Sequence, residues 1–132
     1  MESNHLIIRE SLFSDCTVFA AWEKTPFIME HFTMSKDRDY EQVAKEFVVN
    51  DHARDKAQFT ICLREEDIPI GRILLSRIDT VADSLDITRI YIGMEEYIGK
   101  GLGEQAMRIL LEYCFIQLHM ERVTLDHLPE NQ

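Results

Sequence analysis

The fold of this chain is decided by residues 85–118, which begin with Leu85-Asp86-Ile87-Thr88-Arg89-Ile90-Tyr91-Ile92, pass through Gly99-Lys100-Gly101-Leu102-Gly103 and continue from Glu104 to Leu118. This order indicates a strand, a short glycine loop and a helix. Three glycines in five residues let the backbone turn tightly and leave no Cβ in the way of a ligand. The following helix begins with backbone N–H groups that lack intrahelical partners. The stretch therefore predicts a site for a phosphate-bearing ligand at the end of the strand.

The spacing excludes two common phosphate-binding loops. A dinucleotide loop of the form G-x-G-x-x-G would need a glycine where Glu104 stands. A nucleoside-triphosphate loop has four residues between its glycine and its Gly-Lys pair, and a serine or threonine after the lysine. Here five residues lie between Gly93 and Gly99, and Gly101 follows Lys100. An ordinary strand-to-helix turn is the simpler alternative, but three glycines exceed what such a turn needs.

The glycine loop resembles motif A of the GNAT superfamily of N-acetyltransferases, which reads Arg/Gln-x-x-Gly-x-Gly/Ala. The matching run is Ile98 to Gly103, and the preceding Ile90 to Tyr97 is similar to the end of the family's fourth strand. The resemblance is specific from Leu85 to Gln132 and rests on element order alone before that. Ile98 stands where the family carries arginine or glutamine, so the contribution of that side chain is missing while the backbone donors remain.

Length and composition bound the class of protein. The 132 residues fit one domain, 1–132, and a net charge of −10 argues against non-specific nucleic-acid binding. The same charge is compatible with a cationic acceptor or with solubility alone. No apolar run has membrane-spanning length, and the N-terminus lacks the pattern of a signal peptide. The three cysteines are odd in number and unpaired in spacing, which indicates reduced thiols, a cytoplasmic location and no metal site: Cys16, Cys62 and Cys114.

Apolar periodicity predicts a mixed α/β (α+β) fold. Helices are expected at 16–24, 40–49 and 104–118, and strands at 6–8, 58–63, 68–78, 85–92 and 122–126. Pro26 to Phe32 is expected to be irregular, Asn50 to Lys56 to be a loop, and Gly71 to mark a possible bulge. Trp22 suits either the core or the acceptor pocket that the resemblance places near it. Short turns favour an antiparallel meander, followed by a parallel strand pair joined by a crossover helix.

The resemblance implies that acetyl-CoA is the cosubstrate and an amine the acceptor. In the family, the strands that match 85–92 and 122–126 splay apart, and the pantetheine arm lies between them. The arm would then contact main chain at Ile90, Tyr91 and Ile92. The pyrophosphate would meet the N–H groups of the glycine loop, with Lys100 either adding a point charge or simply solvated. These groups belong to Ile98, Gly99, Lys100, Gly101, Leu102 and Gly103.

Transfer to an amine requires a proton acceptor, because a primary amine is mostly protonated at neutral pH and must be neutral to attack the thioester. Asp86 lies where many members of the family carry a glutamate and is the first candidate. Glu95 is the second. The alternative for both is a surface carboxylate in an acidic chain. His31, His119 and His127 have no spacing that marks them, so structural roles are expected.

The resemblance also implies a C-terminally incomplete domain, because the family continues with a tyrosine-bearing helix and a hairpin while this sequence stops at Gln132. An uncovered strand at 122–126 would then favour a homodimer through this C-terminal edge. Two other functions stay open: a non-catalytic acyl-CoA-binding or regulatory module, and an assembly component completed by a partner chain. The acceptor is left open between a polyamine, an aminoglycoside and a protein N-terminus.

Overall fold

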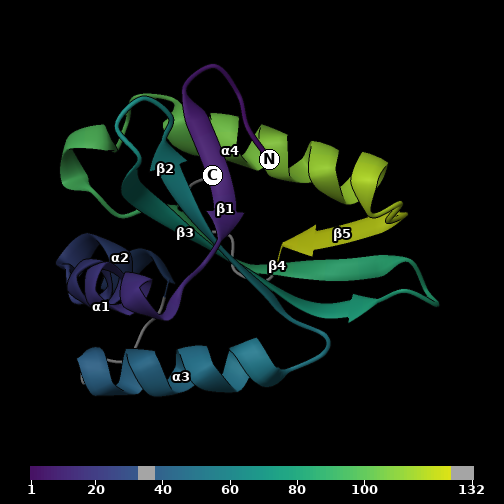
Figure 1. Ribbon diagram of the computed structural model, residues 1–132, viewed down its shortest axis with the longest axis horizontal. Helices are drawn as coiled ribbons and strands as arrows, with labels where there is room; N and C mark the ends of the chain where they lie inside the picture. The colour runs from purple at the N-terminus through teal and green to yellow at the C-terminus, as the bar shows by residue number, and fades with distance from the viewer. Residues whose placement is uncertain (33–37, 126–132) are drawn as a thin grey trace.

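A computed structural model describes residues 1–32 and 38–125. The described strands form one mixed sheet in the order β1-β2-β3-β4-β5 (Figure 1). The first three pairings are antiparallel and the β4–β5 pairing is parallel, which confirms the predicted meander and crossover. The strands are β1 (Leu6–Glu10), β2 (Ala57–Leu63), β3 (Ile68–Asp79), β4 (Ser84–Ile92) and β5 (Arg122–Leu125).

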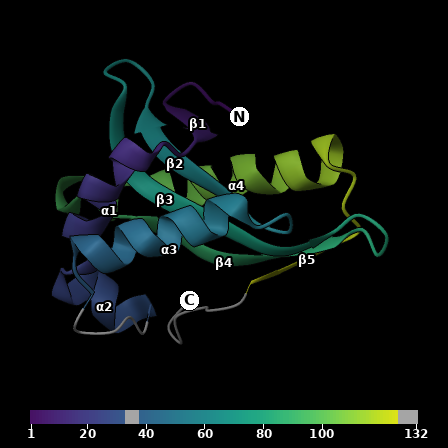
Figure 2. The same ribbon diagram turned by 60° about the horizontal axis from the view of Figure 1, so that its bottom comes forward.

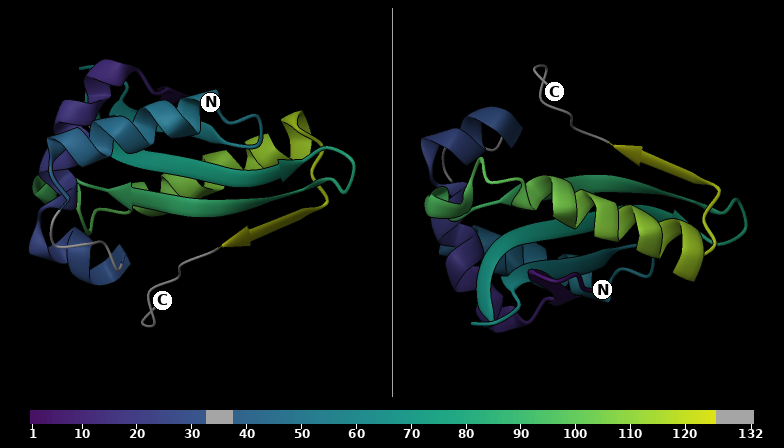
Figure 3. Two further views of the ribbon diagram at one scale, coloured as in Figure 1. Left: turned by 90° about the horizontal axis from the view of Figure 1, so that it is seen from below. Right: turned by 90° about the horizontal axis from the view of Figure 1, so that it is seen from above.

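Helices cover both faces of this sheet. The long helix α4 lies on one face, and α1 and α3 lie on the other, with α2 beside α1 (Figures 2 and 3). The helical elements are η1 (Phe13–Asp15), α1 (Cys16–Glu23), α2 (Pro26–Phe32), α3 (Tyr40–His52), η2 (Glu95–Tyr97), α4 (Leu102–Glu112) and the π-helical turn η3 (Tyr113–Gln117).

Each face of the sheet carries its own apolar core. The larger core packs α4 and the π-helical turn η3 against the sheet through Ala106, Leu110 and Cys114, which recur at helical spacing. The smaller core joins α1 and α3 to β4 and contains Phe19, Trp22, Val43, Phe47 and Tyr91, among others. Trp22 is buried, with its ring 6.1 Å from that of Tyr91, so it belongs to the core.

Two segment predictions were wrong. Residues 26–32 form the helix α2, because Pro26 at its first position fixes a helical φ and lacks only an N–H that needs no partner there. The helix α3 runs on to His52 because Asn50 is buried on the same face as Phe47, so the predicted polar loop begins later.

The helix α4 starts at Leu102, and its last turn widens where the N–H of Leu118 donates to the carbonyl of Tyr113 at 3.0 Å.

An extra residue in β4 changes which way its side chains face. Leu74 pairs with Arg89 but Leu75 pairs with Ile87, so Thr88 is inserted as a bulge. Successive side chains alternate between faces, so one extra residue shifts the phase. Without the bulge, Arg89 would face α4. With it, three β4 residues share the α1 and α3 face opposite Ser76, Leu74 and Arg72 of β3: Asp86, Arg89 and Tyr91.

A second bulge holds the end of β4. Ile61 pairs with Gly71 and Cys62 with Pro69, so Ile70 is the extra residue, next to the predicted Gly71. The carbonyl of Ile70 accepts from the N–H of Gly93 at 2.7 Å, just beyond β4. Gly71 is needed because a Cβ there would collide with the carbonyl oxygen of Tyr91.

The parallel pair is short in the described part of the chain. Ser84 pairs with Arg122 and Ile87 with Leu125, while β4 continues to Ile92. Figure 3 shows β5 turning away from β4 toward its C-terminal end. The residues from Asp126 onward lie outside the described residues, as does His127. Pairing between two copies through β5 stays a prediction.

Gly93→Ala is expected to destabilise the fold by about 1–3 kcal/mol, because a Cβ there would overlap the Trp22 ring. An ideal Cβ at Gly93 lies 2.7 Å from Trp22 Cε3, with two ring atoms nearer still. Urea unfolding measures the effect. Gly103→Ala is the matched control, since its Cβ meets nothing nearer than Ile92 Cγ1 at 3.7 Å. Equal stability of Gly93→Ala and the parent would contradict this packing.

Candidate active site

The glycine loop opens toward solvent at the start of α4. Gly99 has φ +81° and Gly101 has φ +78°, and this left-handed conformation favours glycine. A Cβ at either position would meet nothing within 4 Å, so neither glycine is packed against the rest of the protein. Gly101 is also the N-cap residue of α4. The backbone therefore needs glycine for its φ angles here, and it leaves open space in front of the loop.

Several N–H groups at the start of α4 are free donors. The first α4 bond is donated by the N–H of Gln105 to the carbonyl of Gly101 at 3.1 Å. Within residues 1–32 and 38–125, the N–H groups from Gly99 to Glu104 have no hydrogen-bond partner. The N–H of Ile98 is different, because it donates to the carbonyl of Glu95 at 3.2 Å. The loop thus presents a cluster of donors at the positive end of a helix, which suits a phosphate group.

Asp86 lies on the face of β4 that carries α1 and α3. Its carboxylate binds Nε of Arg77, and its side chain is 16% exposed. Its partner across the strand pair is Ser76, whose hydroxyl accepts from Nζ of Lys56 at 3.2 Å. Asp86 is thus a half-buried carboxylate paired with Arg77, on the same face as Arg89 and Tyr91.

Glu95 is exposed in η2, beyond the other end of β4. The two carboxylates that the sequence singled out therefore lie at opposite ends of this strand and do not form a pair. His119 is exposed in the turn before β5, and His31 lies in α2. No group of His, Cys, Asp and Glu in the described ranges is arranged to hold a metal ion.

A buried ion network, which sequence reasoning missed, joins α1 to the sheet. The carboxylate of Glu23 has no exposed surface and accepts from Nη2 of Arg38 at 2.6 Å and from Nη1 of Arg72 at 2.7 Å. It also accepts from the hydroxyl of Tyr91. Arg72 is equally buried, with its guanidinium 4.5 Å from the ring centroid of Phe19. An arginine inside an apolar strand was the available signal, because such a charge requires a buried partner.

The surroundings of Glu23 decide its charge. Burial would raise the pKa of this carboxyl, but Arg72, Arg89 and Arg38, with the Tyr91 hydroxyl, hold it below its usual value. Burial and the neighbouring Glu23 raise the pKa of Tyr91 well above its ordinary value. At neutral pH, Glu23 is therefore ionised and Tyr91 is neutral and able to donate.

The network continues toward the surface through α3. Glu46 accepts from Arg38 at 3.0 and 3.1 Å and from Arg89 at 2.7 Å. Burial raises the pKa of Glu46, but the Arg38 and Arg89 guanidiniums outweigh it and lower the pKa to about 2. Three arginines thus face two glutamates, and the buried Nε atoms of Arg38 and Arg72 have no hydrogen-bond partner among the described residues.

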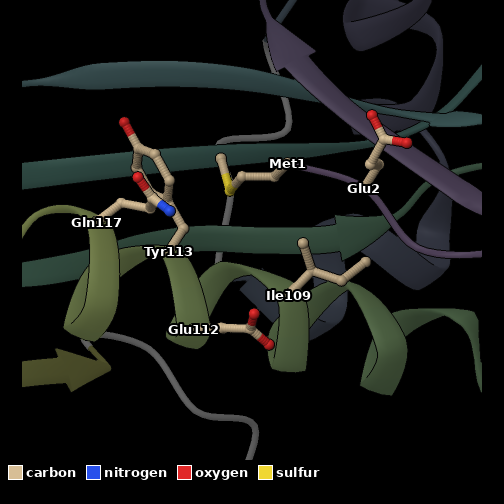
Figure 4. A pocket seen from close by; sticks show the side chains of 6 residues that line it. All are labelled: Met1, Glu2, Ile109, Glu112, Tyr113 and Gln117. Atoms are coloured by element: carbon tan, nitrogen blue, oxygen red, sulfur yellow. The ribbon is translucent and has the colours of Figure 1, made fainter.

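Two surface hollows border α4. One, of about 470 Å³, lies beside the glycine loop and is lined by Tyr97, Lys100 and Leu102 together with the β2–β3 turn. The other, of about 310 Å³, lies at the far end of α4. Figure 4 shows Met1 and Glu2 of the N-terminal segment near Ile109, Glu112, Tyr113 and Gln117. The first hollow is the one that adjoins the free N–H donors.

Comparison with known proteins places this geometry in a family. A family model described as an acetyltransferase (GNAT) domain matches residues 5–132. The chain belongs to the GNAT acetyltransferase family. As a member of this family it is an N-acetyltransferase. Among the described helices, none is both long enough and apolar enough to cross a membrane.

Several known GNAT proteins are similar to this chain. The uncharacterized N-acetyltransferase YnaD of Bacillus subtilis (strain 168) is 26% identical over 129 residues, which cover 98% of this chain and 73% of that protein. The spermidine N-acetyltransferase of Vibrio cholerae in complex with CoA and spermine has a TM-score of 0.82 at 19% identity, covering 93% of this chain and 71% of that one. A domain from Methanocaldococcus jannaschii has a TM-score of 0.74 at 21% identity, covering 91% and 75%. These structures confirm the expected fold.

The ion pairs of Glu46 predict a pH-dependent stability difference. The pKa of Glu46 is lowered from 4.5 to about 2, so its contribution is fully present above pH 4.5 and is lost as the pH falls toward 2. Glu46→Gln is therefore expected to be less stable than the parent at pH 7, with a difference that shrinks below pH 4.5. Urea unfolding of both proteins across this range measures it. A difference that does not change with pH would contradict the role of Glu46.

Proposed function

We propose that this GNAT protein transfers the acetyl group of acetyl-CoA to a primary amine, either on a small molecule or at a protein N-terminus. The observation that carries the proposal is the row of N–H groups from Gly99 to Glu104, which have no partner among the described residues. Such donors at a helix N-terminus fit the pyrophosphate of CoA. The described pairing with β5 ends at Ile87, before the end of β4, which fits an arm lying along the rest of the strand.

The residues expected to hold acetyl-CoA fall into two groups. The main chain of Ile90, Tyr91 and Ile92 would bind the pantetheine arm. The loop from Gly99 to Gly103 would bind the pyrophosphate, with Lys100 as an added charge. Ile98 would contribute less, because its N–H already donates to the carbonyl of Glu95. When bound, acetyl-CoA supplies the thioester that the amine attacks.

Asp86 is the proposed proton acceptor. It lies on the side of the sheet that carries α1 and α3, and Arg77 orients its carboxylate. A carboxylate held in this way can take the proton of an ammonium group directly or through water, which leaves a neutral nucleophile. Glu95, exposed near the loop, is the second candidate.

The acceptor is left open between a polyamine, an aminoglycoside and a protein N-terminus. A net charge of −10 supports a cationic acceptor, and several structural neighbours are spermidine N-acetyltransferases. We propose a cytoplasmic location on the basis of the three buried, unpaired cysteines. Turnover of acetyl-CoA with a panel of amines, spermidine included, tests the function. Binding of CoA without turnover of any amine would favour the alternative, a non-catalytic acyl-CoA-binding module, which Ile98 also supports.

Gly101→Val is expected to weaken CoA binding at least tenfold while the protein stays folded. Valine is strained at φ +78°, so the loop must change shape and its N–H groups with it. Calorimetry with CoA measures the affinity, and circular dichroism checks the fold. Asp83→Val is the matched control, because Asp83 has φ 54° in the β3–β4 turn, away from the loop. Unchanged affinity in Gly101→Val would remove the loop from the cosubstrate site.

Asp86→Asn is expected to lower turnover by about 10²- to 10⁴-fold and to leave CoA affinity nearly unchanged, because it removes a proton acceptor and preserves shape. Steady-state assays with an accepted amine measure this, with Glu95→Gln testing the second candidate. Asp79→Asn is the control, since Asp79 is exposed and caps the β3–β4 turn. If Asp86→Asn turns over like the parent, the acceptor of the proton lies elsewhere.

A further inference from the structure

We propose that the hydrogen bond from Tyr91 to Glu23, together with the Glu23–Arg38 ion pair, couples the strand that binds the cosubstrate to the helices on the acceptor side. The inference rests on the proposed function. Tyr91, Glu23 and Arg38 act as positioning residues in this account, because none of them needs to touch the reacting atoms.

Tyr91 is the one residue of the proposed pantetheine-binding run that faces α1. Ile90 and Ile92 belong to the core under α4, whereas Tyr91 belongs to the core formed with α1 and α3. Its main chain would bind the cosubstrate, and its hydroxyl donates to Glu23 at the end of α1. One residue therefore links the strand that would hold the pantetheine arm to the end of α1.

Arg38 links the end of α1 to the start of α3, across the segment that the resemblance places at the acceptor pocket. Glu23 is the last residue of α1, and Arg38 directly precedes Asp39, the N-cap residue of α3. The 2.6 Å bond between them therefore joins the two ends of the segment that contains α2. Glu46 holds the same guanidinium through two bonds, of 3.0 and 3.1 Å, so Arg38 is fixed from both sides.

The bonds around the Glu23 carboxylate fix the relative positions of Tyr91, Arg72 and Arg38. Buried, ionised Glu23 accepts from Arg38 through Oε1, and from both Arg72 and the Tyr91 hydroxyl through Oε2. A shift of β4 at Tyr91 would lengthen a bond to a carboxylate that has no water to replace it. Movement of the strand is therefore transmitted to Arg38 and to the start of α3.

The first test uses CoA alone and needs no acceptor. Hydrogen exchange of the α1 and α3 amides is measured with and without CoA, in the parent and in Tyr91→Phe. We expect CoA to slow exchange at the end of α1 and the start of α3 in the parent, and to slow it at least threefold less in Tyr91→Phe. Equal slowing in both proteins overturns the coupling, as does the absence of any slowing in a parent that binds CoA.

The second test measures kinetics with spermidine, or with whichever amine of the panel the parent acetylates. Arg38→Lys keeps the charge but cannot hold two carboxylates as a planar fork does. We expect a KM for the amine at least fivefold higher, and a KM for acetyl-CoA changed less than twofold. Tyr91→Phe should act in the same direction. The double variant should be no worse than Arg38→Lys, because both act through Glu23.

Arg9→Lys is the matched control for Arg38→Lys. Arg9 also holds a carboxylate with both Nη atoms, at 2.8 and 2.9 Å from Asp15, but this pair joins β1 to the start of α1. Its effect on either KM should be small and should add to that of Tyr91→Phe. A parent that binds CoA but acetylates no amine overturns the proposed function. A working parent whose amine KM is unchanged by Arg38→Lys overturns only the coupling.

Discussion

The packing of α1 and α3 on the sheet depends on the buried carboxylate of Glu23. An ionised carboxylate with no exposed surface is tolerated only when charged donors surround it. Here the donors come from three separate places: β3, β4 and the residue before the N-cap of α3. Apolar contacts between α1, α3 and the sheet supply most of the driving force for packing, but they are not directional. The Glu23 network is directional, so it selects one arrangement of these helices over the sheet.

The bulge at Thr88 makes that network possible. It brings Arg89 and Tyr91 to the face that already carries Asp86, and it follows directly on Ile87, where the described pairing with β5 ends. Beyond this point β4 is held by β3, by the carbonyl of Ile70 and by α1. The strand is therefore fixed from one side and from its helical face. Among the described residues no strand pairs with the outer edge of β4 beyond Ile87, and the proposed function assigns this edge to the ligand.

The sequence predicts the order and pairing of the elements well, because the glycine loop and the apolar periodicity of α4 are local signals. It does not predict which face of the sheet the β4 side chains take after Ile87, since threonine is an ordinary strand residue and nothing marks Thr88 as a bulge. The partners of Glu23 are distant in sequence, so no spacing rule connects them. The α2 helix was missed because its run of bulky apolar residues has no clear period. Asp86 and Glu95 were chosen by their position near the predicted strand at 85–92, and the structure places them at opposite ends of β4, as that prediction implies.

The central claim is that the free donors at the start of α4 receive the phosphates of CoA. The most direct measurement is a titration of the ¹⁵N-labelled protein with CoA, followed through its backbone amide resonances. The account predicts large, saturable shifts for Gly99 to Glu104 and for Ile90 to Ile92, and small ones for amides around Ile109 and Tyr113 at the far end of α4. Saturable shifts confined to that far end, or no shifts at millimolar CoA, would contradict it.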